Sequence, residues 1–140
     1  MRDKQPEFAW QPQPTTEGLL YPDLTNAIHR ACHRVHFVLG TGFLHQVYRR
    51  ATMIELRRSS LNYEYLKKLP VEYEGHSLGE QDARLILVED KVLLATFALR
   101  EGNETMAEQL KAYMRRLGVK LGLLANFYDT RLAIIPVRIK

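Results

Sequence analysis

Four side chains that can bind a transition metal lie close together early in the chain, namely His29, Cys32, His33 and His36. Their spacing of three and four residues places them on one face of a helix. Histidines four residues apart can share a zinc ion, but a structural zinc site takes four ligands, and no second cluster follows to complete the set. The pattern favours histidines on a packed helix, and we expect neither a metal nor another cofactor.

Arginine recurs on the next segment at positions that suit the polar face of a second helix. The net charge of the chain is +4 and its isoelectric point is near 9.3. Arginines contact phosphates without reading base sequence, so this surface is a candidate interface for DNA or RNA. A solvated helix face explains the same pattern equally well. The candidate contact residues are Arg49, Arg50, Arg57, Arg58 and, on a later strand, Arg84.

The first 22 residues differ from the rest because prolines and glutamines dominate them, and we separate this arm from a domain over residues 23–140. Proline fixes φ and removes a backbone donor, so the arm should be extended. It also carries Phe8, Trp10 and Tyr21, although disordered tails are usually poor in such side chains. Two interpretations remain open. The segment is either a loose tail or an arm that packs on its own domain or on a partner, with Trp10 as anchor.

Length and composition place the chain among single-domain globular proteins. It has 140 residues, of which 46% are hydrophobic, enough to bury a core. Its single cysteine excludes an intrachain disulfide. No apolar run approaches the ~18 residues of a membrane span, and the N-terminus has no apolar run of the signal-peptide type. We therefore expect a cytoplasmic protein without membrane contacts.

Apolar residues at helical spacing predict helices over residues 24–38 and 43–58, and a third helix ending at Gly118. Asp23 or Thr25 is the expected N-cap of the first helix, and Asn103 that of the third. On the second helix the expected apolar stripe includes Leu44 and Ile54.

Alternating or continuous apolar runs predict five strands. They lie near residues 61–74 and over 83–88, 92–99, 119–126 and 132–139. The last strand should lie at an edge because Pro136 cannot donate to a ladder. The order ααβββαββ indicates an α/β fold with a central mixed β-sheet flanked by helices.

These landmarks, in this order, resemble the GxxExxY family, a compact branch of the PD-(D/E)XK nuclease superfamily. The match begins with Leu24-Thr25 and continues through Gly40-Thr41-Gly42-Phe43-Leu44 and Val47-Tyr48. It covers residues 24–139 and implies a restriction-endonuclease-like core. Further matching segments are Glu55-Leu56, residues 70–75, 85–92 and 109–118, and the run Gly122-Leu123-Leu124-Ala125-Asn126-Phe127.

The sequence departs from the family at the positions where the resemblance places the catalytic residues. His45 replaces a glutamate, Arg84 replaces a strand aspartate, and Ala95 and Phe97 replace the glutamate and lysine of a Glu-x-Lys motif. Only Gln109 is retained, on the third helix. Hydrolysis of this type needs Mg²⁺ held by carboxylates, and a guanidinium at the central position would repel the ion. The resemblance therefore implies a domain without catalytic residues.

Three hypotheses follow. The leading one is a noncatalytic subunit of a larger assembly that binds a protein partner, with Phe8, Trp10 and Tyr21 as contact candidates. The second is a nucleic-acid-binding module that uses the old cleft and the arginine-rich helix. The third is a metal-dependent nuclease with rearranged acids, because Asp82 lies two residues before Arg84 and would share its strand face.

Overall fold

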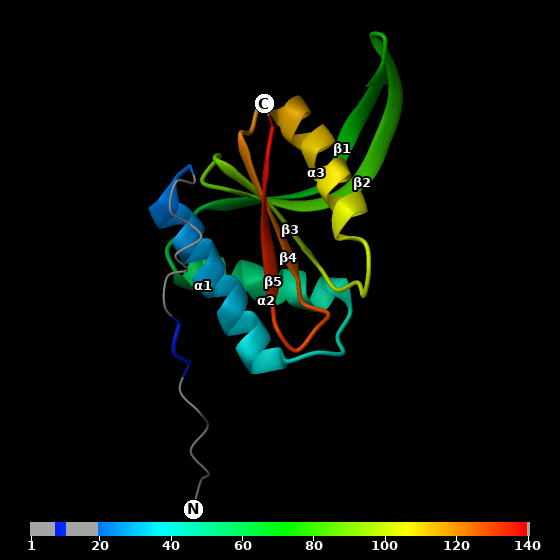
Figure 1. Cartoon of the computed structure of the whole chain (residues 1–140). Helices are drawn as coiled ribbons and strands as arrows, with labels where there is room; N and C mark the ends of the chain where they lie inside the picture. Colours follow the sequence, from blue (N-terminus) through cyan, green and yellow to red (C-terminus); the bar gives the residue numbers. More distant parts are fainter. Residues whose placement is uncertain (1–7, 11–19, 140) are drawn as a thin grey trace, which may run out of the picture.

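The structure of the chain, a computed structural model, describes residues 8–10 and 20–139. These residues form helices and strands in the predicted order ααβββαββ (Figure 1). The elements are α1 (Pro22–Leu39), α2 (His45–Arg58), β1 (Tyr63–Tyr73), β2 (His76–Val88), β3 (Val92–Phe97), α3 (Asn103–Leu117), β4 (Leu121–Asn126) and β5 (Ala133–Arg138).

The five strands form one mixed sheet in the order β1-β2-β3-β4-β5. Neighbouring strands are antiparallel except β3 and β4, which are parallel. A parallel pair cannot be joined by a tight turn, and α3 supplies the crossover between them. The predicted edge position of the last strand is confirmed, since β5 pairs only with β4 within the described sheet. The mixed sheet and its place in the α/β class are likewise confirmed.

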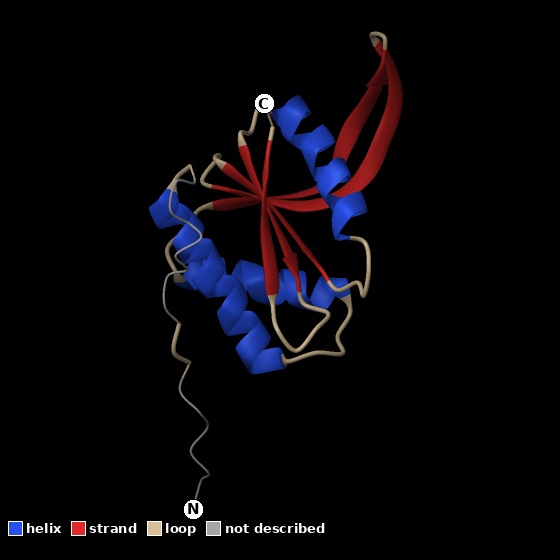
Figure 2. Ribbon diagram, viewed as in Figure 1, coloured by secondary structure: helices blue, strands red, loops and turns tan. Residues whose placement is uncertain are grey.

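Helices cover both faces of the sheet (Figure 2). One apolar cluster joins α1 and α2 to one face, and its largest members include Ile28, Tyr48 and Phe127. A second cluster joins α3 to the opposite face. Because both faces are covered, every residue of β3 and β4 is buried, as their continuous apolar runs predict.

The helix α3 approaches β4 closely at Gly122. A Cβ atom at this position would lie 2.7 Å from the Leu110 Cδ2 and the Met114 Sδ. A side chain at this position would therefore have to displace the Leu110 and Met114 side chains, which now pack directly on the β4 backbone.

The predicted helix caps are wrong. Tyr21, in the left-handed region, precedes α1, and Thr25 lies inside the helix, where its hydroxyl donates to the Leu20 carbonyl. Asn103 is the first residue of α3 rather than its cap, which is Gly102. Asn103 instead accepts a hydrogen bond from Asn126, a contact across the fold that the local sequence does not indicate.

The β1–β2 hairpin is much longer than predicted and extends beyond the rest of the sheet (Figure 1). Residues 76–82 are exposed and polar for the most part, so they lack the apolar alternation that identifies a strand. Backbone pairing holds them, from Tyr73 opposite His76 to Lys68 opposite Asp82. No helix among the described residues has the length and apolar character needed to cross a bilayer.

Candidate functional site

Ala95 and Phe97 lie on β3, in the middle of the sheet, and both side chains point toward α3. They are 2% and 1% exposed. They share an apolar cluster with Leu85 from β2 and with Leu110 and Met114 from α3. This region is therefore packed with hydrocarbon, and the cluster of described residues contains no carboxylate.

Arg84 does not lie with Ala95 and Phe97, contrary to the expectation that it occupies the central position of the same cleft. Its φ is +54°, and its side chain is 51% exposed. The register shifts here, since Leu66 pairs with Leu85 but Lys68 pairs with Asp82. Leu85 and Leu87 face the cluster beneath α3, so alternation alone places Arg84 on the opposite side of β2. The bulge interrupts the regular pleat at this point, and the Arg84 side chain lies in solvent.

The acidic residues near this hairpin also lie apart from the cluster. The Asp82 carboxylate is 3.5 Å from the Arg84 guanidinium, and both side chains are exposed, so the ion pair contributes little. Glu89 and Asp90 form the β2–β3 turn with positive φ. The Glu89 carboxylate accepts a hydrogen bond from the Asn62 amide. In the described part of the chain, no group of three or more His, Cys, Asp or Glu side chains is arranged to hold a metal ion.

His45 and Gln109 are positioned by different helices. His45 is the first residue of α2, which packs on the face opposite α3, and its side chain is half-buried. Gln109 is exposed on α3, while its neighbour Leu110 fills the cluster. The positions that the resemblance assigns to one catalytic centre are thus not assembled into a polar site.

The family model of the PD-(D/E)XK nuclease superfamily matches residues 22–136. The chain belongs to this superfamily. No curated protein and no solved structure gave a significant match. The ααβββαββ order and the mixed sheet agree with the restriction-endonuclease-like fold.

The arginines expected on the polar face of the second helix do not all lie there in this superfamily member. Arg49 is only 7% exposed, and its guanidinium lies 5.4 Å from the centre of the Tyr65 ring. Arg50, Arg57 and Arg58 are exposed. Arg57 donates to the Tyr63 hydroxyl, and Arg58 pairs with Glu55. Arg49 therefore belongs to the packing between α2 and β1, and the exposed arginines remain as candidates for phosphate contact.

Residues 8–10 of the arm lie against α1. The Phe8 ring is 5.6 Å from the Phe37 ring, and the guanidinium carbons of Arg30 and Arg34 are each 5.7 Å from its centre. The Trp10 ring lies 6.2 Å from the His33 ring. These contacts favour an arm that packs on its own domain. The rest of the predicted arm lies mostly outside the described residues.

Tyr21, the third partner-contact candidate, also packs against its own domain. It is half-buried at the start of α1, and the Lys91 ammonium lies 5.5 Å from its ring centre. It joins the edge of the cluster formed by α1 and α2.

Of the four metal-ligand candidates of α1, the three histidines line one cavity, whereas Cys32 packs in the core. Cys32 is buried, and burial raises the pKa of its thiol to about 12, so it carries no thiolate at neutral pH. The His36 Nε2 pairs with the Asp129 carbonyl at 2.8 Å. His29 is 6% exposed. Burial and, to a smaller extent, neighbouring His33 lower the pKa of His29 from 6.5 to about 4.

Acid should destabilise the domain through His29. The folded state holds the imidazole neutral, whereas the unfolded state takes up its proton below about pH 6.5. Keeping His29 neutral therefore costs no stability above pH 6.5. The free energy of unfolding decreases as the pH falls from 6.5 toward 4. At pH 5 the loss should be about 2 kcal/mol. Urea unfolding between pH 7.5 and 5 checks it. His29→Leu should flatten the pH dependence, and parallel curves for the two proteins would contradict the prediction.

Proposed function

We propose that this domain is a catalytically inactive relative of the GxxExxY nucleases and serves as a noncatalytic interaction subunit of a larger assembly. The observation that carries the proposal is the packing of Ala95 and Phe97. Both occupy positions that the resemblance assigns to a catalytic glutamate and lysine, and both are sealed beneath α3 by leucine and methionine side chains. The fold is retained, whereas the side chains that would perform catalysis at these two positions are replaced by apolar ones.

The physical chemistry of phosphodiester hydrolysis supports inactivity. Mg²⁺ requires several oxygen ligands at about 2.1 Å, and carboxylates normally supply the charge that holds it. The cluster beneath α3 presents Leu85, Ala95 and Phe97 instead. The nearest acid along β2, Asp82, is exposed and paired with Arg84. A metal-bound water would have no support at this position.

An exposed apolar surface supports a role in binding protein. Phe43 and Leu44, before α2, and Tyr128, after β4, are 44%, 68% and 43% exposed. A cavity of about 460 Å³ lies beside Phe43, Ala98 and Tyr128. Contiguous exposed apolar side chains of this kind mark interaction sites on soluble proteins. We call Phe43, Leu44 and Tyr128 the apolar rim.

A stable complex isolated from the native host should depend on the apolar rim. Leu44→Lys places a charge where a partner would bury a leucine, and we expect the affinity to fall by about 100-fold or more. Native mass spectrometry and size-exclusion chromatography with light scattering measure the complex. Leu78→Lys is the matched control, because Leu78 is equally exposed (64%) but lies on the distant β1–β2 hairpin.

A nuclease assay completes this test. The purified chain should not cleave single- or double-stranded DNA or RNA in Mg²⁺ or Mn²⁺. Metal-dependent cleavage that disappears in Asp82→Ala would overturn the proposal in favour of a nuclease with rearranged acids. If the complex forms with unchanged affinity in Leu44→Lys, the apolar rim is not the surface that binds the partner.

Nucleic-acid binding is a second candidate, favoured by the exposed arginines of α2. Arg50 and Arg57 present guanidinium groups on one side of the helix. If they contact phosphates, charge reversal of both to glutamate should weaken binding by about 10-fold or more and reduce the slope of log K against log salt by about 2. Fluorescence anisotropy with labelled duplex and single strands checks this. Arg84→Glu tests the hairpin separately, and no binding at low salt would exclude this candidate.

A further inference from the structure

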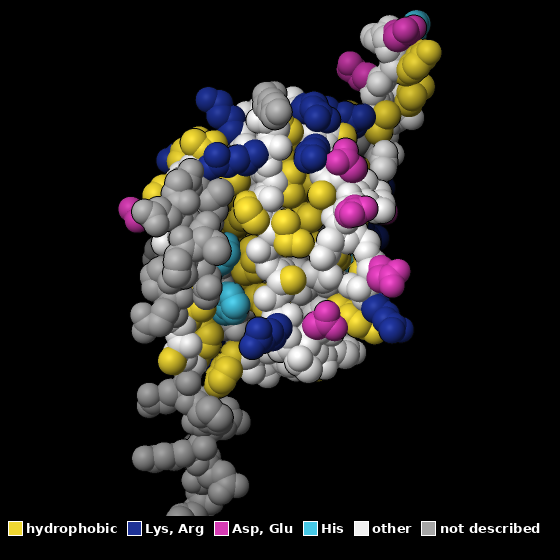
Figure 3. All heavy atoms as spheres, viewed as in Figure 1, with side chains coloured by type: hydrophobic (Ala, Val, Ile, Leu, Met, Phe, Trp, Pro, Cys, Tyr) yellow, Lys and Arg dark blue, Asp and Glu magenta, His cyan; other side chains and the backbone are white. Residues whose placement is uncertain are grey.

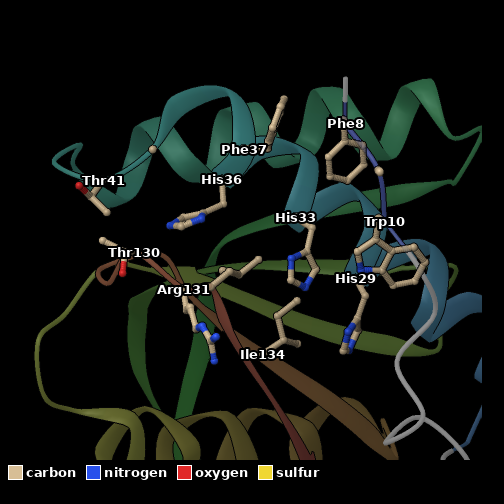
Figure 4. A pocket seen from close by; sticks show the side chains of 13 residues that line it. Phe8, Trp10, His29, His33, His36, Phe37, Thr41, Thr130, Arg131 and Ile134 are labelled. Carbon is tan, nitrogen blue, oxygen red and sulfur yellow. The ribbon is translucent and has the colours of Figure 1, made fainter. Parts of the chain in front are cut away.

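A large cavity lies on the face of the sheet opposite Ala95 and Phe97, between α1, residues 8–10 and the β4–β5 loop (Figure 4). Its volume is about 910 Å³, within the range of small-molecule sites. In Figure 4, Trp10, His29 and His33 gather toward one end, whereas Thr41 and Thr130 lie toward the other. None of the positions that the resemblance assigns to catalysis is among the described residues that line this cavity.

Two polar groups facing this cavity lack a partner. His29 is 94% buried, and neither of its ring nitrogens is hydrogen-bonded to any described residue. The Trp10 Nε1 is inaccessible to solvent and has no partner among the same residues. A buried donor or acceptor without a partner is costly, so such groups usually mark a bound water or ligand. Here a donor-only indole and a neutral imidazole lie in the wall of the same cavity.

The side chains that line the cavity favour a negatively charged ligand. Arg131, Thr130 and three histidines line it, and none of the described lining residues is Asp or Glu. His36 is held in place by its hydrogen bond to the Asp129 carbonyl. Histidine side chains are visible beside apolar atoms on the face shown in Figure 3. With no acidic side chain among the described residues that line the cavity, the Arg131 guanidinium suits a phosphate or carboxylate.

The walls also select the shape of a ligand. Phe8, Trp10 and Phe37 provide aromatic surface, on which a flat ring can stack. The threonine hydroxyls suit a polar group with donors and acceptors, and the guanidinium suits an anion. A single aromatic acid would fill only a small part of about 910 Å³. A heteroaromatic ring joined through a hydroxylated link to a phosphate matches all three groups of residues: the ring suits the aromatic surface, the link suits the threonine hydroxyls and the phosphate suits the guanidinium.

We propose that the cavity between α1 and the β4–β5 loop binds a nucleoside monophosphate, with the base near Trp10 and His29 and the phosphate near Arg131. The base accepts a hydrogen bond from the Trp10 indole and exchanges hydrogen bonds with the neutral His29 ring. The site lies on the opposite face of the sheet from the apolar cluster beneath α3, so it is independent of the proposed loss of catalysis.

Trp10 is the only tryptophan of the chain, so its fluorescence reports on this cavity directly. We expect AMP or UMP, added to the full chain with excitation at 295 nm, to change the emission in a saturable way. Adenosine and inorganic phosphate should each bind at least about 10-fold more weakly than AMP, because each lacks one half of the contacts. Arg131→Ala should weaken AMP by about 10-fold while adenosine is unaffected.

Two variants separate the ligand contacts from folding. His29→Leu keeps the volume but removes both ring nitrogens, and should weaken AMP and adenosine alike. Arg115→Ala, an exposed arginine on α3, is the matched control for Arg131→Ala and should leave every affinity unchanged. Absence of saturable binding by either nucleotide, or equal AMP affinity in Arg131→Ala and the unmodified chain, would overturn the proposal. Saturation by Zn²⁺ alone would replace it with a metal site at the histidines.

Discussion

Phe97→Lys should unfold the domain. The substitution restores the lysine that the resemblance assigns to this position, but Phe97 is 1% exposed and packed against α3. Removing a buried phenylalanine costs about 3–5 kcal/mol, and burying an ammonium without a partner costs several more. The sum approaches the whole stability of a typical domain, about 5–15 kcal/mol. Circular dichroism and urea unfolding measure the result.

Phe97→Leu is the control for this experiment, since it keeps the apolar character and should cost only about 1–2 kcal/mol. Adding Ala95→Glu to the lysine variant should not rescue folding, because the glutamate would enter the same sealed cluster. A folded double variant that cleaves DNA in Mg²⁺ would contradict both the packing argument and the proposed inactivity.

Asn126→Ala should cost about 2–4 kcal/mol, because Asn126 ties three parts of the fold together. Its side-chain amide donates to the Leu99 carbonyl and the Asn103 side chain. Its oxygen accepts from the backbone amides of Leu99 and Tyr128. Asn126 is buried, so truncation leaves these backbone groups without a partner. Chemical denaturation followed by circular dichroism gives the change in free energy of unfolding.

Asn103→Ala is the matched control, because it removes only one of these hydrogen bonds and should cost less than about 1 kcal/mol. Asn126→Asp keeps the acceptor but places a carboxylate opposite the Leu99 carbonyl, so it should resemble the alanine variant in stability. A loss below about 1 kcal/mol for Asn126→Ala would show that water replaces the network.

Much of the fold follows from periodicity along the chain. The ααβββαββ order and the edge position of β5 were predicted from apolar spacing and Pro136, and the structure confirms both. The stripe of α2 is a partial exception, since Leu44 and Ile54 are exposed rather than buried. Leu44 precedes the first residue of α2, and Ile54 points away from the face that buries Tyr48, Thr52 and Leu56.

The site was predicted less well than the fold, because the resemblance places Arg84 in one cleft with Ala95 and Phe97. Neighbouring residues of a strand point to opposite faces, and Leu85 occupies the face toward α3, so Arg84 does not share it. Residues 82–85 contain no glycine or proline that would mark the bulge at this point. Arg49 was misplaced for a related reason. Its long side chain reaches the Tyr65 ring on β1, a contact between segments that local spacing does not report.

The sequence by itself determined the element order, the superfamily resemblance and the apolar residue types at positions 95 and 97, because these depend on residue type and local period. Only the tertiary structure decided that this region is sealed, that Arg84 faces solvent, and that Trp10 meets His29 and His33 around a cavity. Those outcomes depend on strand register and on packing between residues far apart in the chain. Neither is encoded in the period of a single segment.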